Sequence, residues 1–317
     1  MDTSSLKGMI RGRLEFDHPM APETTYRAGG PASVLAEPED EADVARVLGW
    51  AATNGVRTLF LGGGSNVLFA DEGFEGVVIR PGEGLRSIRI EGDTVKAGAG
   101  VPLAAVLHKA SESGLGGLEY CAGIPGTVGG AVIGNAGGKE GWVGERVQEL
   151  TVVTPEGAVR VLPRDEVQWS YRHSSLKGSG LFLARVLLRL PKEAPDEARR
   201  KARQYWEARK TCQPLGKRNA GSTFKNPSDG FAGEMLEKAG LKGYRVGGAC
   251  VSEVHSNFID LEAEGCSHDV VAVMREMQKR VLEMTGIRLE PETLPLGDWK
   301  SADVADVWWN LSPERFR

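Results

Sequence analysis

Two glycine-rich runs are the segments of this chain that could bind a phosphate-containing ligand. The first, GGGSN at residues 62–66, directly follows the apolar run TLFL. A glycine loop after a strand lets several backbone N–H groups approach the oxygens of one phosphate. Ser65 and Asn66 add side-chain donors at the same place. A tight turn inside a protein core explains this run equally well when it is considered alone.

The first run matches neither of the two common nucleotide-binding loops. A Rossmann loop has the pattern GxGxxG and begins a helix, and a P-loop carries a lysine after its glycines. Here the chain continues as VLFADEGFEGVVIR, which is extended and rich in turn residues. The sequence therefore predicts a phosphate-binding loop of another kind.

The second run, GIPGTVGGAVIGNAGG, extends from Gly123 to Gly138. Its glycines recur at intervals of about three residues, and each costs about 0.5–1 kcal/mol relative to alanine inside a helix or strand. Some partner must therefore require a bare backbone, and a flat ring or a diphosphate lying against it would do so. Two such loops suit a dinucleotide better than a single phosphate.

The elements around these runs alternate between helix and strand signals. Apolar residues repeat at helical spacing in 41–52, where Val44, Val47, Leu48 and Ala51 share one face. Further helices are predicted over 102–113, 191–210, 233–239 and 268–284, the last with Ser267 as N-cap. Strands are predicted over 57–61, 76–80, 87–90, 94–97, 150–154, 158–162 and 181–190.

Seven segments carry a resemblance to a known family. They are TTYRAGGPA, LGGGSNVL, GIPGTVGGAVIGNAGG, SYRHSSLKG, AGSTFKNP, AGLKGYRVGGACVSEVHSNFI and LEPE. Each alone is a modest signal, but they occur in family order over nearly the whole chain up to about Gly297. The ordered set resembles the UDP-N-acetylenolpyruvoylglucosamine reductases, the flavoenzymes of peptidoglycan precursor synthesis. The short span between Arg172 and Ser222 resembles the type II form of that family.

The chain departs from the family pattern at four places. The second run continues as GGKEGWVGE, Gly134 stands where a larger apolar residue is common, and Thr293 stands where valine is common. The tail from Lys300 onward has no counterpart in the family pattern.

The resemblance implies an α+β fold. A two-lobed FAD-binding domain of the vanillyl-alcohol-oxidase (PCMH) type would occupy residues 1–200, with lobes at about 1–80 and 81–200. A smaller α+β substrate-binding domain would follow over 201–300, and the tail 301–317 has no assigned role. The change to a charged helix over 191–210 independently favours a domain boundary there.

The resemblance also implies the reaction. NADPH, as co-substrate, would reduce non-covalently bound FAD. A hydride would then pass to C3 of the enolpyruvyl ether of UDP-N-acetylglucosamine enolpyruvate and a proton to C2, giving UDP-N-acetylmuramate. The FAD-binding residues implied by the motifs are Tyr26, Arg27, Gly62, Gly63, Gly64, Ser65, Asn66, Gly123, Pro125, Gly126, Thr127, Gly129, Gly130 and Asn135.

Three residues match the catalytic positions of the family motifs. Ser222 would donate the proton to C2, a strong base in the intermediate. The guanidinium of Arg172 would hold the substrate carboxylate as charge develops on it. Glu292 would orient one of these groups or share in proton delivery. Glu290 is the alternative, because alternate residues of an extended segment face the same side.

Substrate contacts are implied at Asn226 and Lys242. Lys210 forms a basic cluster with Lys217 and Arg218 that could meet the diphosphate, although a solvated surface explains this cluster equally well. The partner expected at this site is a small-molecule UDP-sugar.

Composition excludes several other classes of protein. A net charge of −4 does not indicate a nucleic-acid binder. No segment approaches the ~20 apolar residues that span a bilayer, and the start has no signal-peptide core. The four cysteines are scattered, so we expect reduced thiols and no metal site. We expect a cytoplasmic monomer.

Two alternatives belong to other functional classes. An FAD oxidase or dehydrogenase of a small alcohol, from the same superfamily, would share the glycine loops but not GSTFKNP together with LEPE. A nucleotide-sugar binding protein without catalysis would be expected to lack Ser222, Arg172 or Glu292, and all three are present.

Overall fold

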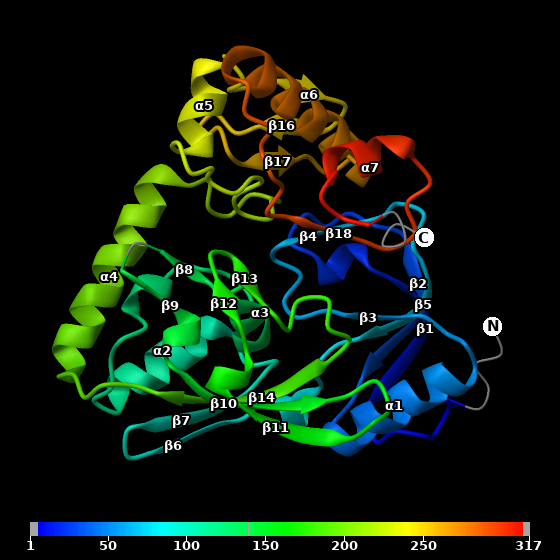
Figure 1. Cartoon of the computed structure of the whole chain (residues 1–317), viewed down its shortest axis with the longest axis vertical. Helices are drawn as coiled ribbons and strands as arrows, with labels where there is room; N and C mark the ends of the chain where they lie inside the picture. Colours follow the sequence, from blue (N-terminus) through cyan, green and yellow to red (C-terminus); the bar gives the residue numbers. More distant parts are fainter. Residues whose placement is uncertain (1–5, 139, 313–317) are drawn as a thin grey trace. The chain divides into compact units, whose positions relative to one another are not determined.

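The computed structural model describes residues 6–138 and 140–312 (Figure 1). The chain divides into two compact units. Unit 1 comprises Met1–Phe16, Val34–Gly63 and Gly76–Arg209, and unit 2 comprises Asp17–Ser33, Gly64–Glu75 and Lys210–Arg317.

The division near residue 209 lies close to the predicted domain boundary, but two N-terminal segments lie in unit 2. The cause is strand pairing: β4 (Val67–Phe69) pairs in parallel with β18 (Leu294–Leu296). A short strand of the N-terminal region thus forms a two-stranded sheet with a strand of the C-terminal part.

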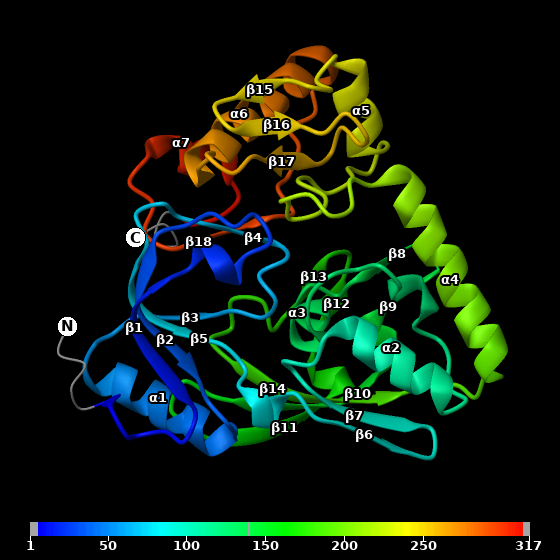
Figure 2. The same cartoon turned by 180° about the vertical axis from the view of Figure 1, so that it is seen from behind.

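Unit 1 contains a five-stranded sheet in the order β11-β10-β14-β7-β6. The helices α2 (Leu103–Glu112) and α3 (Val128–Ile133) lie over this sheet in both views (Figures 1 and 2). The two predicted hairpins and the long apolar strand are confirmed. The strands are β6 (Ile88–Glu91), β7 (Thr94–Gly98), β10 (Val147–Val153), β11 (Val159–Pro163) and β14 (Phe182–Arg189).

The predicted helix over 41–52 is confirmed as α1 (Glu41–Thr53). Its four predicted apolar residues are buried. A four-stranded sheet in the order β1-β2-β5-β3 comprises β1 (Arg13–Pro19), β2 (Pro31–Glu37), β5 (Phe74–Ile79) and β3 (Thr58–Phe60).

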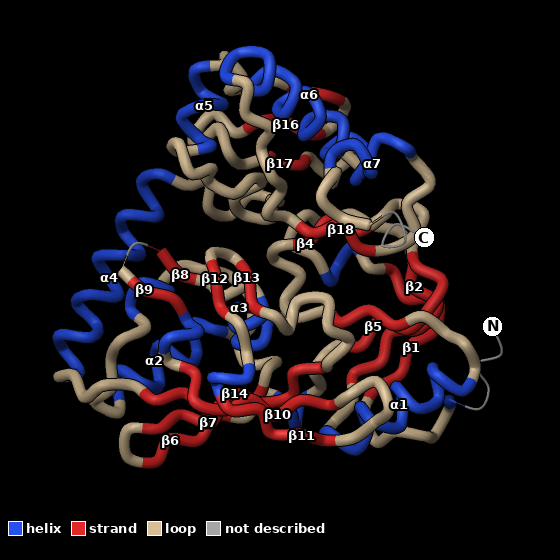
Figure 3. Tube along the Cα trace, in the orientation of Figure 1, coloured by secondary structure: helices blue, strands red, loops and turns tan. Residues whose placement is uncertain are grey.

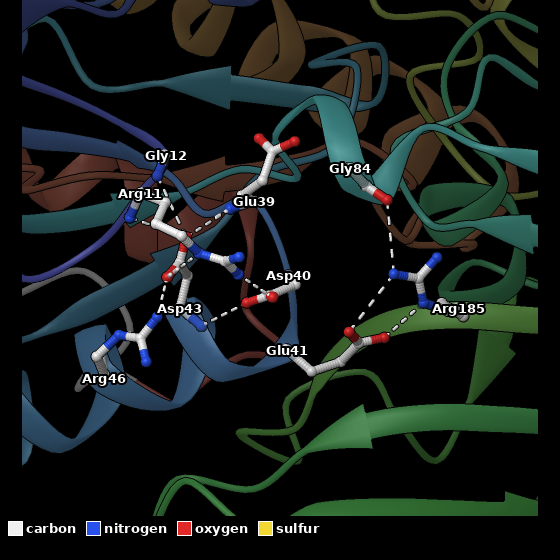
Figure 4. Close-up of polar contacts among 9 residues, drawn as sticks. All are labelled: Arg11, Gly12, Glu39, Asp40, Glu41, Asp43, Arg46, Gly84 and Arg185. Atoms are coloured by element: carbon white, nitrogen blue, oxygen red, sulfur yellow. Dashed lines mark hydrogen bonds and ion pairs between the residues drawn. The ribbon is translucent and has the colours of Figure 1, made fainter.

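The N-terminus of α1 is fixed by the fully buried side chain of Asp43 (Figure 4). Its Oδ2 accepts hydrogen bonds from the backbone N–H groups of Glu39 at 3.1 Å and of Arg11 and Gly12 at 3.2 Å each. Its Oδ1 forms an ion pair with Arg46. One buried carboxylate thus joins the helix to the chain that precedes β1.

Helix α4 (Pro195–Cys212) is the predicted charged helix, and only Ala198 of it is buried. Arg209 near its C-terminal end donates a hydrogen bond to the carbonyl of Tyr120 at 3.1 Å. The remaining short strands of unit 1 are β8 (Gly137–Gly138), β9 (Gly141–Trp142), β12 (Trp169–Ser170) and β13 (His173–Ser174).

Unit 2 is built around α6 (Ser267–Thr285), α5 (Ala232–Lys238) and a small antiparallel sheet. Residues 213–231 form a long loop without a helix or strand (Figure 3). The strands of the small sheet, in order, are β15 (Arg245–Val246), β16 (Ala249–Val251) and β17 (Ile259–Leu261).

The predicted N-cap of α6 is wrong by one residue. Cys266 is the N-cap, and Ser267 is the first residue of the helix. Ser267 is buried, and its hydroxyl donates to the carbonyl of Phe69 at 2.6 Å. Its side chain therefore serves packing within unit 2, a long-range contact that local sequence does not reveal.

The tail contains a further helix, α7 (Ala302–Val307), which packs on α6. Trp308, directly after it, is one of the largest fully buried side chains. Among the described residues, the short 3-10 helices are η2 (Ala21–Glu23), η3 (Glu83–Leu85), η4 (Glu119–Cys121), η5 (Val143–Glu145) and η6 (Arg164–Glu166). Among the described helices, none has the length and apolar character needed to cross a membrane.

Candidate functional site

The two glycine runs meet within unit 1. A Cβ atom added at Gly62 would lie 2.7 Å from the hydroxyl of Thr127, and one at Gly63 would lie 3.0 Å from the Cα of Gly126. Real Cβ atoms do not make contacts as short as the first of these. Glycine at these two positions therefore lets the runs approach closely, Gly62 against the side chain of Thr127 and Gly63 against the backbone of Gly126.

Packing does not account for every glycine of the second run. Gly129 is required by packing, because an added Cβ would lie 2.8 Å from the Cβ of Ala99. Gly130 is exposed, and within unit 1 an added Cβ there would meet only Thr127, at 3.7 Å. A bare, uncovered stretch of backbone beside two joined glycine loops fits a flat ring or a diphosphate, and thus FAD.

Three predicted site residues have a strained backbone. Arg27, Asn135 and Arg172 have φ angles of 53°, 43° and 55° although none is glycine. Such conformations cost of order 1–3 kcal/mol and persist where the surroundings impose them, as they often do at functional sites.

Asn135 links the second glycine run to the segment that carries Arg172. It is buried, its Oδ1 accepts from the backbone N–H of Gly144 at 3.1 Å, and its Nδ2 donates to the carbonyl of Ser170 at 2.9 Å. The amide side chain thus forms hydrogen bonds with the backbone of two loops, which fixes the turn between β12 and β13.

Arg172 lies in that turn. Its Nη1 donates to the carbonyl of Gly137 at 3.0 Å, so the guanidinium lies at the end of the second glycine run. The guanidinium carbon lies 5.7 Å from the ring centroid of Trp142 and 5.4 Å from that of Tyr171. Trp142 belongs to GGKEGWVGE, so this departure from the family pattern contributes a cation–π partner to Arg172.

Within unit 2, the first loop continues through Gly64, Ser65 and Asn66. Gly64 has φ 63°, and an added Cβ there would lie 2.0 Å from the carbonyl oxygen of Glu23. Tyr26 is 1% exposed in the core of unit 2, and this burial raises the pKa of its hydroxyl. The ring of Tyr26 therefore packs in the core of unit 2, and its contact with FAD stays a prediction.

Ser222 and Glu292 lie on two segments of unit 2 that pair through their backbones. The N–H of Glu292 donates to the carbonyl of Thr223 at 2.8 Å, and the N–H of Lys225 donates to the carbonyl of Glu290 at 2.9 Å. Gly221 has φ 75°, as expected for an unusual backbone before Ser222. The structure thus pairs the two segments that contain these predicted catalytic residues.

The two glutamates of LEPE have different surroundings. Glu290 accepts hydrogen bonds at Oε1 from Nζ of Lys225 at 2.6 Å and from Nδ2 of Asn310 at 2.8 Å. The carbonyl of Glu292 accepts from Nδ2 of Asn66, at 3.2 Å, on the first loop. Glu290 therefore takes part in an ion pair with Lys225 and a hydrogen bond with Asn310.

One residue of this site was not selected from the sequence. Asn257 is 3% exposed, its Oδ1 accepts from the N–H of Phe224 at 3.0 Å, and its Nδ2 donates to the carbonyl of the same residue at 2.8 Å. It therefore fixes the loop directly after Ser222. The HSNFI segment that contains it carried the only available signal, as part of a family motif.

The predicted substrate residues occupy separate places. Asn226 accepts from the backbone N–H of Ala232 at 3.0 Å, close to Ser222 in the chain. Lys242 forms a 2.8 Å ion pair with Glu237, and Lys210 belongs to α4. The described residues contain no group of three or more histidine, cysteine, aspartate or glutamate side chains that could hold a metal ion.

The comparisons with known proteins define the class first. Residues 32–162 match a family model described as an FAD binding domain, so the chain is a flavoprotein. Residues 213–294 match the C-terminal domain of UDP-N-acetylenolpyruvoylglucosamine reductase. The predicted α+β fold with an FAD-binding domain and a smaller C-terminal domain is confirmed.

Full-length relatives define the family. The chain is 38% identical to a UDP-N-acetylenolpyruvoylglucosamine reductase from Agathobacter rectalis, over 89% of this chain and 94% of the relative. It is 39% identical to one from Moorella thermoacetica, over 92% and 97%. The crystal structure of this reductase (MurB) from Thermus caldophilus is similar with a TM-score of 0.78 and 33% identity, over 90% of this chain and 99% of that chain. The chain belongs to the UDP-N-acetylenolpyruvoylglucosamine reductase family.

Proposed function

We propose that this chain reduces the enolpyruvyl ether of UDP-N-acetylglucosamine enolpyruvate to UDP-N-acetylmuramate, using Arg172, Ser222 and Glu292. The reaction class and the use of FAD and NADPH follow from membership of the family. The observation that supports this assignment of residues is the backbone hydrogen bond from Glu292 to Thr223, which pairs the segment of Glu292 with the segment that contains Ser222.

The glycine runs are proposed to hold FAD. Gly62 and Gly63 with Gly126 and Thr127 would surround its diphosphate, and the bare backbone at Gly130 would face a flat part of the molecule. When bound there, FAD would supply the hydride transfer from NADPH to the vinyl carbon of the substrate. The remaining predicted contacts, which include Arg27, Ser65, Asn66 and Asn135, are proposed to complete this site.

Arg172 is proposed to bind the carboxylate of the enolpyruvyl group. Its guanidinium is always charged, and two of its coplanar N–H groups can donate to the two oxygens of one carboxylate. Trp142, Tyr171 and the carbonyl of Gly137 restrict its guanidinium before substrate arrives. Such preorganised charge stabilises the negative charge that develops on the carboxylate in the transition state.

Ser222 is proposed to donate a proton to C2, and Glu292 to position it or to share in proton delivery. A serine hydroxyl is a weak acid, but a carbanion is a strong base, so the transfer is favourable when the geometry is right. Glu290 is assigned a structural role because it already accepts from Lys225 and Asn310.

The UDP-sugar is proposed to be bound by Asn226, Lys242 and Lys210, whose side chains supply an amide and two positive charges. We also propose that the protein is cytoplasmic, which is the location expected of an enzyme that acts on a nucleotide-linked precursor, and that it is a monomer. The monomer is tested by light scattering of the purified protein at several concentrations.

The test of the proposed function is NADPH oxidation with and without the enolpyruvyl substrate. The purified protein should be yellow, and NADPH should be consumed in proportion to the enolpyruvyl substrate added. An FAD oxidase of the same superfamily would instead consume a small alcohol and oxygen. A yellow protein whose NADPH oxidation does not change when the enolpyruvyl substrate is added would refute the proposal.

A further inference from the structure

The C-terminal tail contacts the segment that carries Glu290 and Glu292. Trp308 is 1% exposed, and its Nε1 donates to the carbonyl of Thr293 at 2.7 Å, one residue after Glu292. Asn310 donates to the carboxylate of Glu290 at 2.8 Å. These contacts lie within unit 2.

Gln278 of α6 strengthens the same connection. Its side chain is buried, and its Nε2 donates both to the carbonyl of Leu289 at 2.9 Å and to the carbonyl of Val307 at 3.0 Å. A single amide group thus joins the beginning of the LEPE segment to the end of α7. On the other side, LEPE is paired with the backbone of Thr223 and Lys225.

The extended segment 289–293 is therefore held from two sides. The loop with Ser222 lies along one side, and the tail supplies donors to Thr293 and Glu290 from residues 308 and 310. The family-model match ends at residue 294, so these donors come from a part of the chain outside it.

We propose that Trp308 and Asn310 are positioning residues that hold the segment carrying Glu292 against the loop that carries Ser222. The proposal rests on the proposed catalytic role of Glu292. Trp308 acts through the backbone at Thr293, whose displacement would move the adjacent Glu292. Asn310, together with Lys225, keeps Glu290 in its ion pair and so prevents an exchange of the two carboxylates.

The test is a double-mutant cycle in the full-length, FAD-loaded protein. Trp308→Phe removes the indole N–H but keeps an aromatic ring, and Trp309→Phe is the matched control because Trp309 is 45% exposed. Flavin reduction by NADPH and flavin reoxidation by the enolpyruvyl substrate are measured separately by stopped-flow absorbance. FAD content and the melting temperature are measured for each variant.

Trp308→Phe should slow reoxidation by about 3- to 10-fold, the effect of one hydrogen bond. Flavin reduction and FAD content should stay within about 2-fold of wild type, as both should for Trp309→Phe. In a Glu292→Gln background, Trp308→Phe should have no further effect, because a residue that acts through Glu292 loses its effect when that carboxylate is absent.

The proposal would be overturned if Trp308→Phe slowed reoxidation by the same factor in the wild-type and Glu292→Gln backgrounds, or if it slowed both half-reactions equally. Trp308 would then have a structural role only. If Trp308→Phe does not fold, Asn310→Ala can replace it in the double-mutant cycle with Glu292→Gln. Asn310→Ala should slow flavin reoxidation by about 2- to 5-fold. If Glu292→Gln alone reoxidises as fast as wild type, the catalytic role of Glu292 fails. If Glu292→Gln is slow but both tail variants match wild type, only the positioning role fails.

Discussion

Replacing Gly63 by alanine should weaken FAD binding, because the two glycine runs leave no room for a methyl group. The added Cβ would lie 3.0 Å from the Cα of Gly126 and 3.5 Å from its carbonyl carbon. Carbon atoms in favourable contact are about 3.5–4.0 Å apart, so the backbone at Gly126 must move by a few tenths of an ångström. The obstacle is backbone, and no flexible side chain can turn away from it.

The expected cost follows from overpacking, which typically amounts to about 1–3 kcal/mol. If this strain opposes the loop shape that FAD requires, the dissociation constant of FAD should rise by about 5- to 150-fold. The assay is titration of the apoprotein with FAD, followed by flavin fluorescence. Gly49→Ala is the matched control, because no atom lies within 4 Å of its added Cβ in the middle of α1.

Gly49→Ala should leave FAD affinity unchanged and should raise the free energy of unfolding by about 0.5–1 kcal/mol, because alanine favours a helix over glycine. Gly63→Ala with the same FAD dissociation constant as wild type would refute the assignment of the joined glycine runs to the cofactor.

Three further predictions concern Arg172, Asp43 and the cysteines. Arg172→Lys keeps the charge but loses the planar donors, so turnover should fall at least ~10-fold with FAD content unchanged; near wild-type turnover would contradict carboxylate binding. Asp43→Asn should lower the free energy of unfolding by about 2–3 kcal/mol at pH 7 in urea titrations, while Asp165→Asn, at an exposed side chain, should not. Burial opposes ionisation of Asp43, but hydrogen bonds from Glu39, Arg11 and Gly12 and the ion pair with Arg46 lower its pKa overall. The stability that Asp43 contributes should therefore be complete above the unfolded pKa of about 4 and should vanish as the pH falls through the lower pKa of the folded protein. A difference in unfolding free energy between wild type and Asp43→Asn that does not depend on pH would contradict this. Burial raises the pKa of the Cys121 thiol to about 12, so iodoacetamide at pH 8 should modify exposed Cys212 in the native protein and spare Cys121, which mass spectrometry of the digested protein would check.

Local pattern was sufficient to predict many of the longer helices and strands. Helix α1 was predicted because its apolar residues repeat at helical spacing and pack together inside unit 1. The hairpin of β6 and β7 was predicted because Gly92 supplies the positive φ of its turn. In both cases the physical cause of the element lies within a few residues.

Long-range contacts could not be predicted in this way. The pairing of β4 with β18 joins residues more than 220 positions apart, and the burial of Trp308 depends on α6 and on Thr293. Glu290 and Glu292 could not be separated by spacing, because they face the same side of an extended segment. The ion pair of Glu290 with Lys225, which spans 65 residues, is visible in the structure alone.

The central claim, that Ser222 protonates C2 of the enolpyruvyl substrate, is tested most directly by Ser222→Ala in the two half-reactions measured separately. Flavin reduction by NADPH needs no proton at C2 and should stay close to wild type. Reoxidation by the enolpyruvyl substrate should slow by at least ~10²- to 10⁴-fold, which corresponds to roughly 2.7–5.5 kcal/mol of barrier. Ser222→Cys should recover part of this loss, because a thiol can still donate a proton. Equal slowing of both half-reactions, or no slowing of either, would contradict the account.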